Sequence, residues 1–383
     1  MRTPDQIRAA LQSAIAKTEL DFAERKSVIW MIYSALVSGS HVWLFGPPGE
    51  AKSLLIRYIV SHVADSRFFD LQMYRDRRAE EVFGPLKLSE LKNDKYERKT
   101  EGYLYDAHYA LIDEGGRSSA IIRDGMLRIA NERTYRNGDK VYPGSLEAMF
   151  SGSNSLLTDE ESAAFVDRFP GIVKVPRVSE EGLEDLFIRQ ERDPDHKAVH
   201  MPSAPVVTLD EMHVARDAAN NVTMDEDFIR GDWMRAVRAL HKAGIRPSTR
   251  RWLVVQNSIR ALAWLMGDDK VSAKHCEWLS NFVWRTEDER RVAEKVLSDN
   301  FNPKLSEATR EHDLAKAVFD SVPTDCTDGP TFRRANVSMR KHITAIKERM
   351  DSADASGRME TLLRDVEGWA NEVRRRATDA VGV

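Results

Sequence analysis

A glycine-rich loop between an apolar run and a helical pattern is the feature that most constrains the fold of this chain. Residues 46–53 read Gly-Pro-Pro-Gly-Glu-Ala-Lys-Ser and directly follow the apolar run Val42–Phe45. Backbone N–H groups that converge at a helix N-terminus bind phosphate, and a lysine at the end of the loop adds positive charge. The sequence therefore predicts a strand, a phosphate-binding loop and a helix in succession.

Each residue type in this loop has an expected task. Lys52 would place a positive charge at the β- and γ-phosphates of a nucleotide, and the Ser53 hydroxyl would ligate Mg²⁺. Gly46 and Gly49 are expected to supply the unusual backbone dihedrals of such a loop. Ala51 replaces the glycine of the full pattern, which the loop tolerates if φ is negative there. The predicted nucleotide-binding residues are Gly46, Pro47, Pro48, Gly49, Glu50, Ala51, Lys52, Ser53 and Leu54.

A second apolar run ends in two acids. Leu111 and Ile112 precede Asp113 and Glu114. At the end of a buried strand, Asp113 can hold Mg²⁺ through water, while Glu114 can orient and polarise an attacking water. These parts suffice in principle, because phosphoryl transfer mainly requires positioning and charge stabilisation. An Asp-Glu pair alone is a common strand-end turn, but its place after a phosphate loop predicts a nucleotide-hydrolysing site.

Two residues near later strands fit the same chemistry. Asn154 follows the expected strand at 146–151, so its amide could hold the water or the γ-phosphate; a turn-capping asparagine is the alternative. Arg168 precedes another expected strand and suits a subunit edge, as a finger that completes a neighbour's site. A surface ion pair with Asp167 is equally compatible with the sequence.

A pair of arginines in the second half of the chain is a further candidate. Arg250 and Arg251 follow Ser248 and Thr249, and Ser248 is the expected N-cap of a helix. One of the two arginines could fold back onto the γ-phosphate. Two solvated arginines at a helix start are the alternative.

The bulk composition limits the class of protein. The 383 residues carry a net charge of −4, from 57 basic and 61 acidic residues, without the basic excess typical of nucleic-acid binders. The two cysteines, Cys276 and Cys326, lack partners at metal-ligand spacing, so no zinc module or disulfide framework is expected. No apolar stretch reaches the ~20 residues that span a bilayer, and the N-terminus lacks the apolar core of a signal peptide. We therefore expect a cytoplasmic protein without a membrane span.

Short apolar runs alternate with helical patterns along the first half of the chain. This alternation predicts an α/β fold with a parallel sheet of about five strands and crossover helices. Strands are expected at 41–45, 68–73, 109–112, 146–151 and 172–175, and helices at 5–38, 53–64 and 119–131. Two insertions interrupt the pattern: residues 74–108, with a hairpin expected around Tyr96–Tyr105, and residues 132–145, where Asn137-Gly138 is a strong hairpin-turn signal.

The domain organisation follows from where these signals change. Residues 1–180 are expected to form the α/β core, including the N-terminal helices and both insertions. Residues 181–207 are charged, contain three prolines and are typical of a linker. Helical patterns predict an all-α lid over 208–300. Heptad-like spacing predicts a helical extension over 301–383, an antiparallel hairpin broken at Asp351–Gly357, which either stabilises the protein or docks a partner.

Together these motifs resemble the AAA+ ATPases, specifically the MoxR branch, and within it the RavA-type regulatory ATPases. The resemblance implies an AAA+ P-loop core in which Gly46–Ser53 is Walker A, Asp113 and Glu114 are Walker B, and Asn154 is sensor 1. It further implies that Arg168 is the arginine finger and that Arg250 is the better fit for sensor 2. The stretches that carry it are Gly46–Ser53, Glu81–Leu86, Tyr96–Arg98, Gly102–Leu104, Ile112–Glu114, Ala130–Arg133, Arg136–Gly138, Ser153-Asn154, Asp167-Arg168 and Ser248–Trp252.

The resemblance also implies cofactors, assembly and partners. ATP and Mg²⁺ would bind at the interfaces of a homo-oligomeric ring, usually a hexamer. The ring would couple hydrolysis to chaperone-like remodelling or activation of a protein partner, often one with a von Willebrand factor A domain. Residues 74–108 resemble the helix-2 insert of this clade, and 132–145 the hairpin before sensor 1. Gly115-Gly116-Arg117 departs from the family, whose members usually carry an apolar residue directly after the two acids.

Two other functions remain as alternatives. Related AAA+ branches are nucleic-acid motors or clamp loaders, and basic residues at 75–78 could contact phosphates. Acids interleave with these basic residues and the net charge is negative, so nucleic acid is an unlikely ligand. The third hypothesis is a structural ring that binds nucleotide and hydrolyses it poorly, because Gly115-Gly116 could alter the helix after the catalytic acids.

Overall fold

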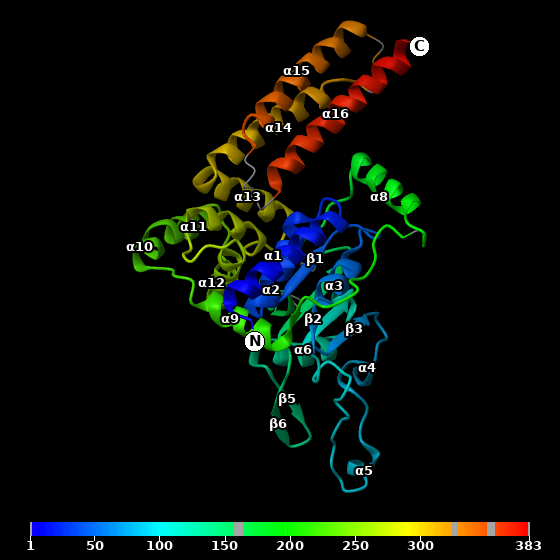
Figure 1. Cartoon of the computed structure of the whole chain (residues 1–383), viewed down its shortest axis with the longest axis vertical. Helices are drawn as coiled ribbons and strands as arrows, with labels where there is room; N and C mark the ends of the chain where they lie inside the picture. The colour runs from blue at the N-terminus through cyan, green and yellow to red at the C-terminus, as the bar shows by residue number, and fades with distance from the viewer. Residues whose placement is uncertain are drawn as a thin grey trace. The chain divides into compact units, whose positions relative to one another are not determined.

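The computed structural model describes residues 2–156, 164–195, 197–323, 326, 328–350 and 357–381. The chain divides into two compact units, Met1–Ala293 and Glu294–Val383 (Figure 1). In the described part of the chain, no helix combines the length and the apolar character needed to cross a membrane.

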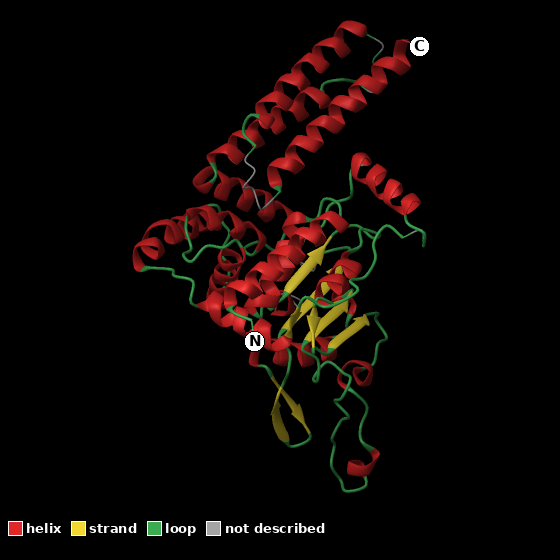
Figure 2. Cartoon of the chain, in the orientation of Figure 1, coloured by secondary structure: helices red, strands yellow, loops and turns green. Residues whose placement is uncertain are grey.

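The first unit is built around the predicted parallel sheet. Its five strands lie in the order β3-β4-β7-β1-β8, and every neighbouring pair is parallel (Figure 2). The strands are β3 (Phe68–Gln72), β4 (Tyr109–Asp113), β7 (Ala148–Ser153), β1 (Val42–Phe45) and β8 (Gly171–Lys174). The sheet confirms the predicted α/β class and all five strand positions to within a few residues. Parallel strands covered on both faces are apolar throughout, as residues 109–112 of β4 are here.

Helices flank this sheet. α2 (Lys26–Ser38) and α3 (Lys52–Val60) pack on β1, β4, β7 and β8. Apolar residues of α6 (Ala120–Glu132) share a buried cluster with alternate residues of the strands, such as Trp43 and Ile172. The helix predicted over 5–38 is two helices, because α1 (Pro4–Asp21) is followed by Phe22 in an extended conformation and by Glu24 in a left-handed one with φ +60°.

The two insertions extend from the same end of the sheet (Figure 1). The Asn-Gly hairpin is confirmed: β5 (Thr134–Asn137) pairs antiparallel with β6 (Lys140–Pro143). The hairpin predicted around Tyr96–Tyr105 is wrong, since Lys87 N donates to Glu97 O at 2.8 Å and Lys99 N to Pro85 O at 2.8 Å. Residues 97–99 thus pair with residues 85–87 through an isolated antiparallel bridge between Leu86 and Arg98. Residues 85–87 lie between the short helices α4 (Ala79–Phe83) and α5 (Leu88–Leu91).

Part of the predicted linker is helical. α8 (Glu180–Arg192) occupies the first half of residues 181–207. The Ser179 side chain caps it by accepting from Gly182 N, with acids in the first turn and arginines in the last. These charges complement the helix dipole, and the charged composition that resembled a linker is in part the composition of a well-capped helix.

A group of helices follows in the region predicted as the lid. These elements belong to the same compact unit as the sheet, and α9 and α12 pack against α2. The short strand β9 (Val207–Thr208) pairs with β2 (Val63–Ala64). The remaining elements are α9 (Leu209–Asn220), α10 (Glu226–Phe228), the π-helical turn η2 (Ile229–Trp233), α11 (Met234–Lys242), α12 (Thr249–Leu265) and the 3-10 helix η3 (Ala273–Asn281).

The second unit is a bundle of three long helices rather than the predicted two-helix hairpin. It begins inside α13 (Glu287–Phe301), at Glu294 rather than at residue 301. The bundle consists of α14 (Pro303–Asp320), α15 (Gly329–Lys347) and α16 (Arg358–Val381). The heptad-like residues of α15 and α16 pack together, and Ala308 and Ala315 of α14 complete their core. Residues 351–356 of the predicted break lie outside the described residues.

Candidate functional site

The predicted phosphate loop, the acidic pair and Asn154 lie at the carboxyl ends of three adjacent strands. The loop Gly46–Ser53 connects β1 to α3, Asp113 ends β4, and Asn154 follows β7. Because β7 lies between β4 and β1, and Gly152 is in register with Asp113, these chain ends meet at one edge of the sheet. This edge is where open parallel α/β sheets bind ligands.

The Lys52 side chain is fixed at the centre of this edge. Its Nζ donates to Gly46 O at 2.8 Å, to Pro47 O at 2.7 Å and to Asn154 Oδ1 at 3.1 Å. Lys52 is only 8% exposed, and burial lowers the pKa of its ammonium while the carboxylates of Glu114 and Asp113 oppose this shift. The structure thus brings together Lys52 and Asn154, which the sequence proposed from separate motifs.

The two predicted magnesium ligands contact each other. Ser53 Oγ donates to Asp113 Oδ2 at 2.6 Å, and Asp113 Oδ1 accepts from the backbone N of Glu114 at 3.1 Å. A hydroxyl and a carboxylate oxygen are ligands that Mg²⁺ prefers. The donor set at Ser53 and Asp113 therefore fits a magnesium ion.

The first turn of α3 fits a phosphate. The first intrahelical hydrogen bond runs from Leu55 N to Ala51 O at 2.9 Å. The N–H groups of Lys52, Ser53 and Leu54 therefore have no acceptor within the helix and can bind an anion.

The backbone of the loop differs from expectation at two positions. Gly49 has the expected left-handed φ of +84°, but Ala51 also has a positive φ of +55°, where a negative value was expected. A left-handed alanine is less stable by roughly 1–2 kcal/mol. Gly46 is required for a different reason than predicted, since a Cβ there would lie 2.2 Å from Val175 O at the end of β8. Close packing of two chain segments, not an unusual φ, demands glycine at this position.

The Glu50 side chain is held by residues that the sequence did not identify. Its carboxylate accepts from Arg25 Nη2 at 2.8 Å and from Val178 N at 3.3 Å. The Arg25 side chain is only 3% exposed. Glu50 therefore links the phosphate loop to the turn before α2 and to the segment before α8. No local motif marks Arg25, because its role depends on segments that are distant in sequence.

Glu114 begins a short 3-10 helix, η1 (Gly115–Arg117), instead of continuing the strand. Its backbone N donates to Gly152 O at 2.7 Å, and its carboxylate Oε2 lies 3.4 Å from Arg117 Nε. Close packing explains the glycine at position 115, because a Cβ there would lie 2.6 Å from Ser151 Oγ of β7. Packing of η1 against β7 thus explains the departure from the family pattern.

The two candidate arginines of the lid differ in environment. Arg251 is 1% exposed and donates to the carbonyls of Phe282 and Val166 at 3.1 Å and of Phe169 at 3.3 Å. Arg250 is exposed. Since the Arg251 guanidinium is committed to internal carbonyls, Arg250 is the residue that remains available for a ligand.

Arg168 lies close to Arg250. Burial lowers the pKa of the Arg168 guanidinium, and the charge of Arg250 lowers it further. Among the described residues, no hydrogen bond or ion pair joins either arginine to the loop or to Asp113 and Glu114. Hydrogen bonds thus join Lys52 to Asn154 and Ser53 to Asp113, whereas the two arginines are linked to neither pair.

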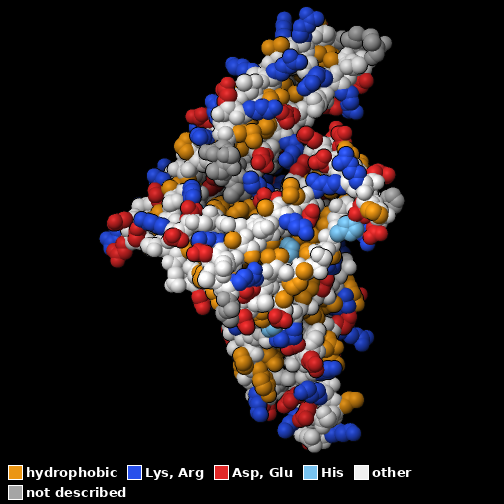
Figure 3. All heavy atoms as spheres, in the orientation of Figure 1, with side chains coloured by type: hydrophobic (Ala, Val, Ile, Leu, Met, Phe, Trp, Pro, Cys, Tyr) orange, Lys and Arg blue, Asp and Glu red, His pale blue; other side chains and the backbone are white. Residues whose placement is uncertain are grey.

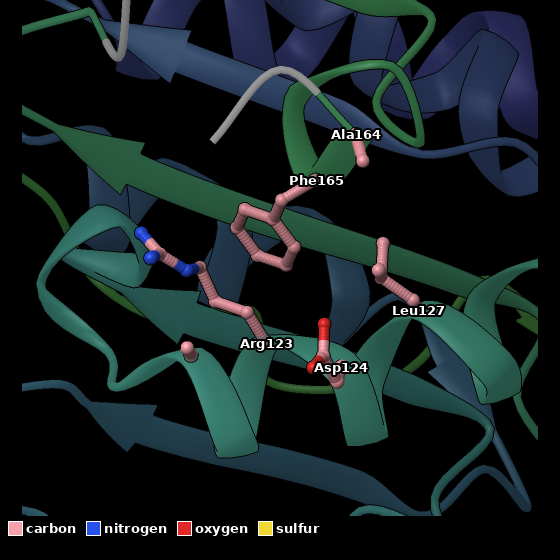
Figure 4. Close-up of a pocket in the computed structure, with 6 residues that line it drawn as sticks. Arg123, Asp124, Leu127, Ala164 and Phe165 are labelled. Atoms are coloured by element: carbon pink, nitrogen blue, oxygen red, sulfur yellow. The ribbon is translucent and has the colours of Figure 1, made fainter. Parts of the chain in front are cut away.

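A cavity of about 300 Å³ is lined by none of the predicted site residues. It is formed between α6 and the segment that carries Phe165, with Arg123 and Asp124 of α6 at its edge (Figure 4). Its lining residues are Ala120, Arg123, Asp124, Leu127, Ala164 and Phe165.

Comparison with known proteins identifies the family. The model of the "MoxR domain in the MoxR-vWA-beta-propeller ternary systems" matches residues 9–201. Two uncharacterized proteins of Methanocaldococcus jannaschii are similar: MJ0812 is 33% identical over 271 residues, 70% of this chain and 69% of that protein. MJ0079 is 30% identical over 304 residues, 79% of this chain and 77% of that protein.

A solved structure shows the same fold. A crystal structure from Cytophaga hutchinsonii, described as that of an ATPase candidate, superposes with a TM-score of 0.62 at 19% identity. The match covers 78% of this chain and 96% of that one. Together with the family match and the P-loop sheet, this identifies the chain as a member of the MoxR-type AAA+ ATPases.

Proposed function

We propose that this chain hydrolyses ATP with Mg²⁺ and that Lys52, Ser53, Asp113 and Asn154 form one half of each site. The hydrogen bond from Lys52 to Asn154, together with that from Ser53 to Asp113, is the observation that carries this proposal. It joins three motifs from separate parts of the chain into one cluster of the composition that phosphoryl transfer requires.

In the proposed reaction, each residue has a positioning task. Lys52 and the N–H groups at the start of α3 bind the β- and γ-phosphates, and Ser53 and Asp113 hold the metal. When bound, Mg²⁺ neutralises charge on the phosphate oxygens. Asn154 and Glu114 orient the attacking water. The ion pair of Glu114 with Arg117 keeps the carboxylate near this edge of the sheet.

We infer that the second half of the site comes from another copy of the chain. The charges of Arg168 and Arg250 interact with each other, and among the described residues no hydrogen bond or ion pair joins either arginine to the phosphate loop. A guanidinium that stabilises the transferring phosphoryl group can be supplied by a neighbouring subunit. We propose a homo-oligomeric ring, a hexamer by family resemblance, in which Arg168 is the finger and Arg250 the sensor-2 arginine.

The proposed cellular role is ATP-driven remodelling or activation of a protein partner in the cytoplasm. The matched family is described as part of MoxR-vWA-beta-propeller ternary systems. This supports a protein with a von Willebrand factor A domain as the partner. The narrower resemblance to RavA-type ATPases remains a prediction.

The surface charge speaks against the nucleic-acid alternative. On the face displayed in Figure 3, basic and acidic side chains are interspersed rather than separated into a basic patch. A nucleic-acid motor needs a continuous basic path along the phosphate backbone. The other alternative, a ring that binds nucleotide with weak hydrolysis, differs from our proposal only in turnover.

A turnover measurement tests the proposal. We expect Lys52→Ala and Glu114→Gln to lower kcat by at least about 100-fold, because each removes a group that acts on the transition state. Lys95→Ala, at an exposed lysine of the first insertion, is the matched control and should keep the wild-type rate. Unchanged turnover in Lys52→Ala and Glu114→Gln would reject the site. A wild type that binds ATP without turnover would favour the structural ring.

A further inference from the structure

We propose that Asp167 is a positioning residue that couples the helical lid to the arginine finger through the buried Arg251. This inference rests on the proposed function, because it concerns how Arg168 and Arg250 are held for the reaction. It concerns a single carboxylate that is neither a predicted site residue nor part of the phosphate loop.

Several lid residues converge on the Asp167 carboxylate. Ser248 Oγ donates to both carboxylate oxygens at 3.2 Å. Arg251 Nε lies 3.4 Å from Asp167 Oδ1, and Arg285 Nη2 lies at the same distance from this oxygen. The carboxylate also forms an ion pair with Arg168, whose Nη1 lies 3.7 Å from Oδ2. The residue beside the finger is thus the anchor for three residues of the lid region.

The contact between Arg251 and Asp167 is buried, so it fixes how the two segments that carry these residues are oriented. The Arg251 side chain is 1% exposed and the Asp167 side chain 12%. Arg251 also donates to the carbonyls of Val166 and Phe169, on both sides of the Asp167-Arg168 pair. A guanidinium with a rigid fork of donors fixes the orientation of the segment it binds. The start of α12 and the finger segment therefore cannot shift independently without breaking these contacts.

The position of this pair explains why it affects the reaction. Ser248 caps α12 by accepting from Arg251 N at 3.2 Å, so the same hydroxyl sets the helix start and contacts Asp167. Arg250 lies in this first turn, and Arg168 directly follows Asp167. Two guanidinium groups repel each other, and the carboxylate of Asp167 supplies the compensating charge. Asp167 thereby contacts Arg168 directly and, through Ser248 and Arg251, holds the first turn of α12, which carries Arg250.

Complementation between variants separates this role from simple stabilisation. Lys52→Ala leaves Arg168 and Arg250 intact but disables its own phosphate loop, whereas Asp167→Asn leaves the phosphate loop intact. In a mixed assembly, an Asp167→Asn subunit next to a Lys52→Ala subunit receives an intact finger. We expect Asp167→Asn alone to lower kcat at least about tenfold with less than a twofold change in KM, and the mixture to regain activity.

Three further samples sharpen the test. Arg168→Ala mixed with Lys52→Ala should regain activity in the same way, and Asp185→Asn, at an exposed aspartate of α8, should behave as wild type. Asp167→Asn could fail to fold because Arg251 is left without its charge partner. In that case the double variant Asp167→Asn/Arg251→Gln, which removes the buried charge as well, takes the place of Asp167→Asn in the same mixture.

The outcomes are distinguishable. Recovery with Arg168→Ala but not with either Asp167 variant would overturn the role of Asp167 and leave the finger in place. The same conclusion follows if Asp167→Asn hydrolyses ATP within twofold of the wild-type rate. Failure of the Arg168→Ala mixture would overturn both the shared site and the coupling. A wild type without turnover would overturn the proposed function itself.

Discussion

Asn154 Oδ1 accepts a hydrogen bond from Lys52 Nζ at 3.1 Å, although the two residues are 102 positions apart in the chain. The contact exists because β7 and β1 are adjacent parallel strands whose carboxyl ends meet. It connects the residue that binds phosphate with the one that we propose orients the water. Perturbing Asn154 should therefore affect turnover more than nucleotide binding.

Asn154→Ala is expected to lower kcat about 10- to 100-fold while the Kd for ATP changes by less than about threefold, since the lost amide acts mainly in the transition state. Steady-state turnover and equilibrium binding of a fluorescent ATP analogue measure the two effects. Asn93→Ala, at an exposed asparagine of the first insertion, serves as the control. A matching loss of affinity and turnover would show that Asn154 only shapes the binding site.

Ala51→Gly should stabilise the first unit. Ala51 has a φ of +55°, and glycine adopts this conformation without a Cβ clash. We expect the free energy of unfolding to rise by about 0.5–1 kcal/mol, after the entropy that glycine gains in the unfolded chain is subtracted. Ala9→Gly, in the exposed interior of α1, should instead lower it by about 1 kcal/mol. Denaturant unfolding of both variants measures the two changes. A lower free energy of unfolding in Ala51→Gly would show that the backbone of Ala51 is not strained.

Asn137→Ala should loosen the two insertions from each other. Asn137 accepts from Arg98 N at 2.6 Å and donates to Arg98 O at 3.1 Å, so its side chain bridges the hairpin to the first insertion. Losing both bonds leaves polar backbone groups unpaired, at a stability loss of about 1–3 kcal/mol. We expect faster tryptic cleavage within residues 87–99, followed by mass spectrometry. Asp139→Ala, exposed in the same turn, should not accelerate cleavage; equal rates in both variants would exclude the bridge.

His41 should make the first unit less stable in mild acid. Burial and the charge of Arg133 lower the pKa of His41 to about 3. The unfolded chain, with an ordinary histidine pKa near 6.5, binds the proton first, so stability falls as the pH drops from about 6.5 towards 3.

A pH series of denaturant unfolding for His41→Gln measures this contribution. We expect a shallower decline of the unfolding free energy between pH 6.5 and 4 than in the wild type, because one proton-binding site of the unfolded chain is gone. His241→Gln, at a partly exposed histidine of α11, is the control for removing a histidine without burial. Identical pH slopes in His41→Gln and the wild type would rule out a neutral buried His41.

The local elements of the site could be predicted from the sequence. Apolar runs and glycine positions within a few residues predict the strand, loop and helix around Gly46–Ser53. They also predict the strand that ends at Asp113. The hairpin follows from the Asn-Gly signal, although the positive φ falls on Gly138 alone while Asn137 pairs with Lys140 in the ladder. These features depend on short-range chemistry, which the sequence displays directly.

Packing decided the features that the sequence could not show. Three features depend on segments far apart in the chain. They are the positive φ of Ala51, the ion pair of Arg25 with Glu50, and the third helix of the C-terminal bundle. The sequence alone determined that this chain carries a phosphate loop and its acidic partner. Only the tertiary structure decided that Arg251 is buried against Asp167 while Arg250 is exposed, because burial is a property of neighbours and not of a residue type.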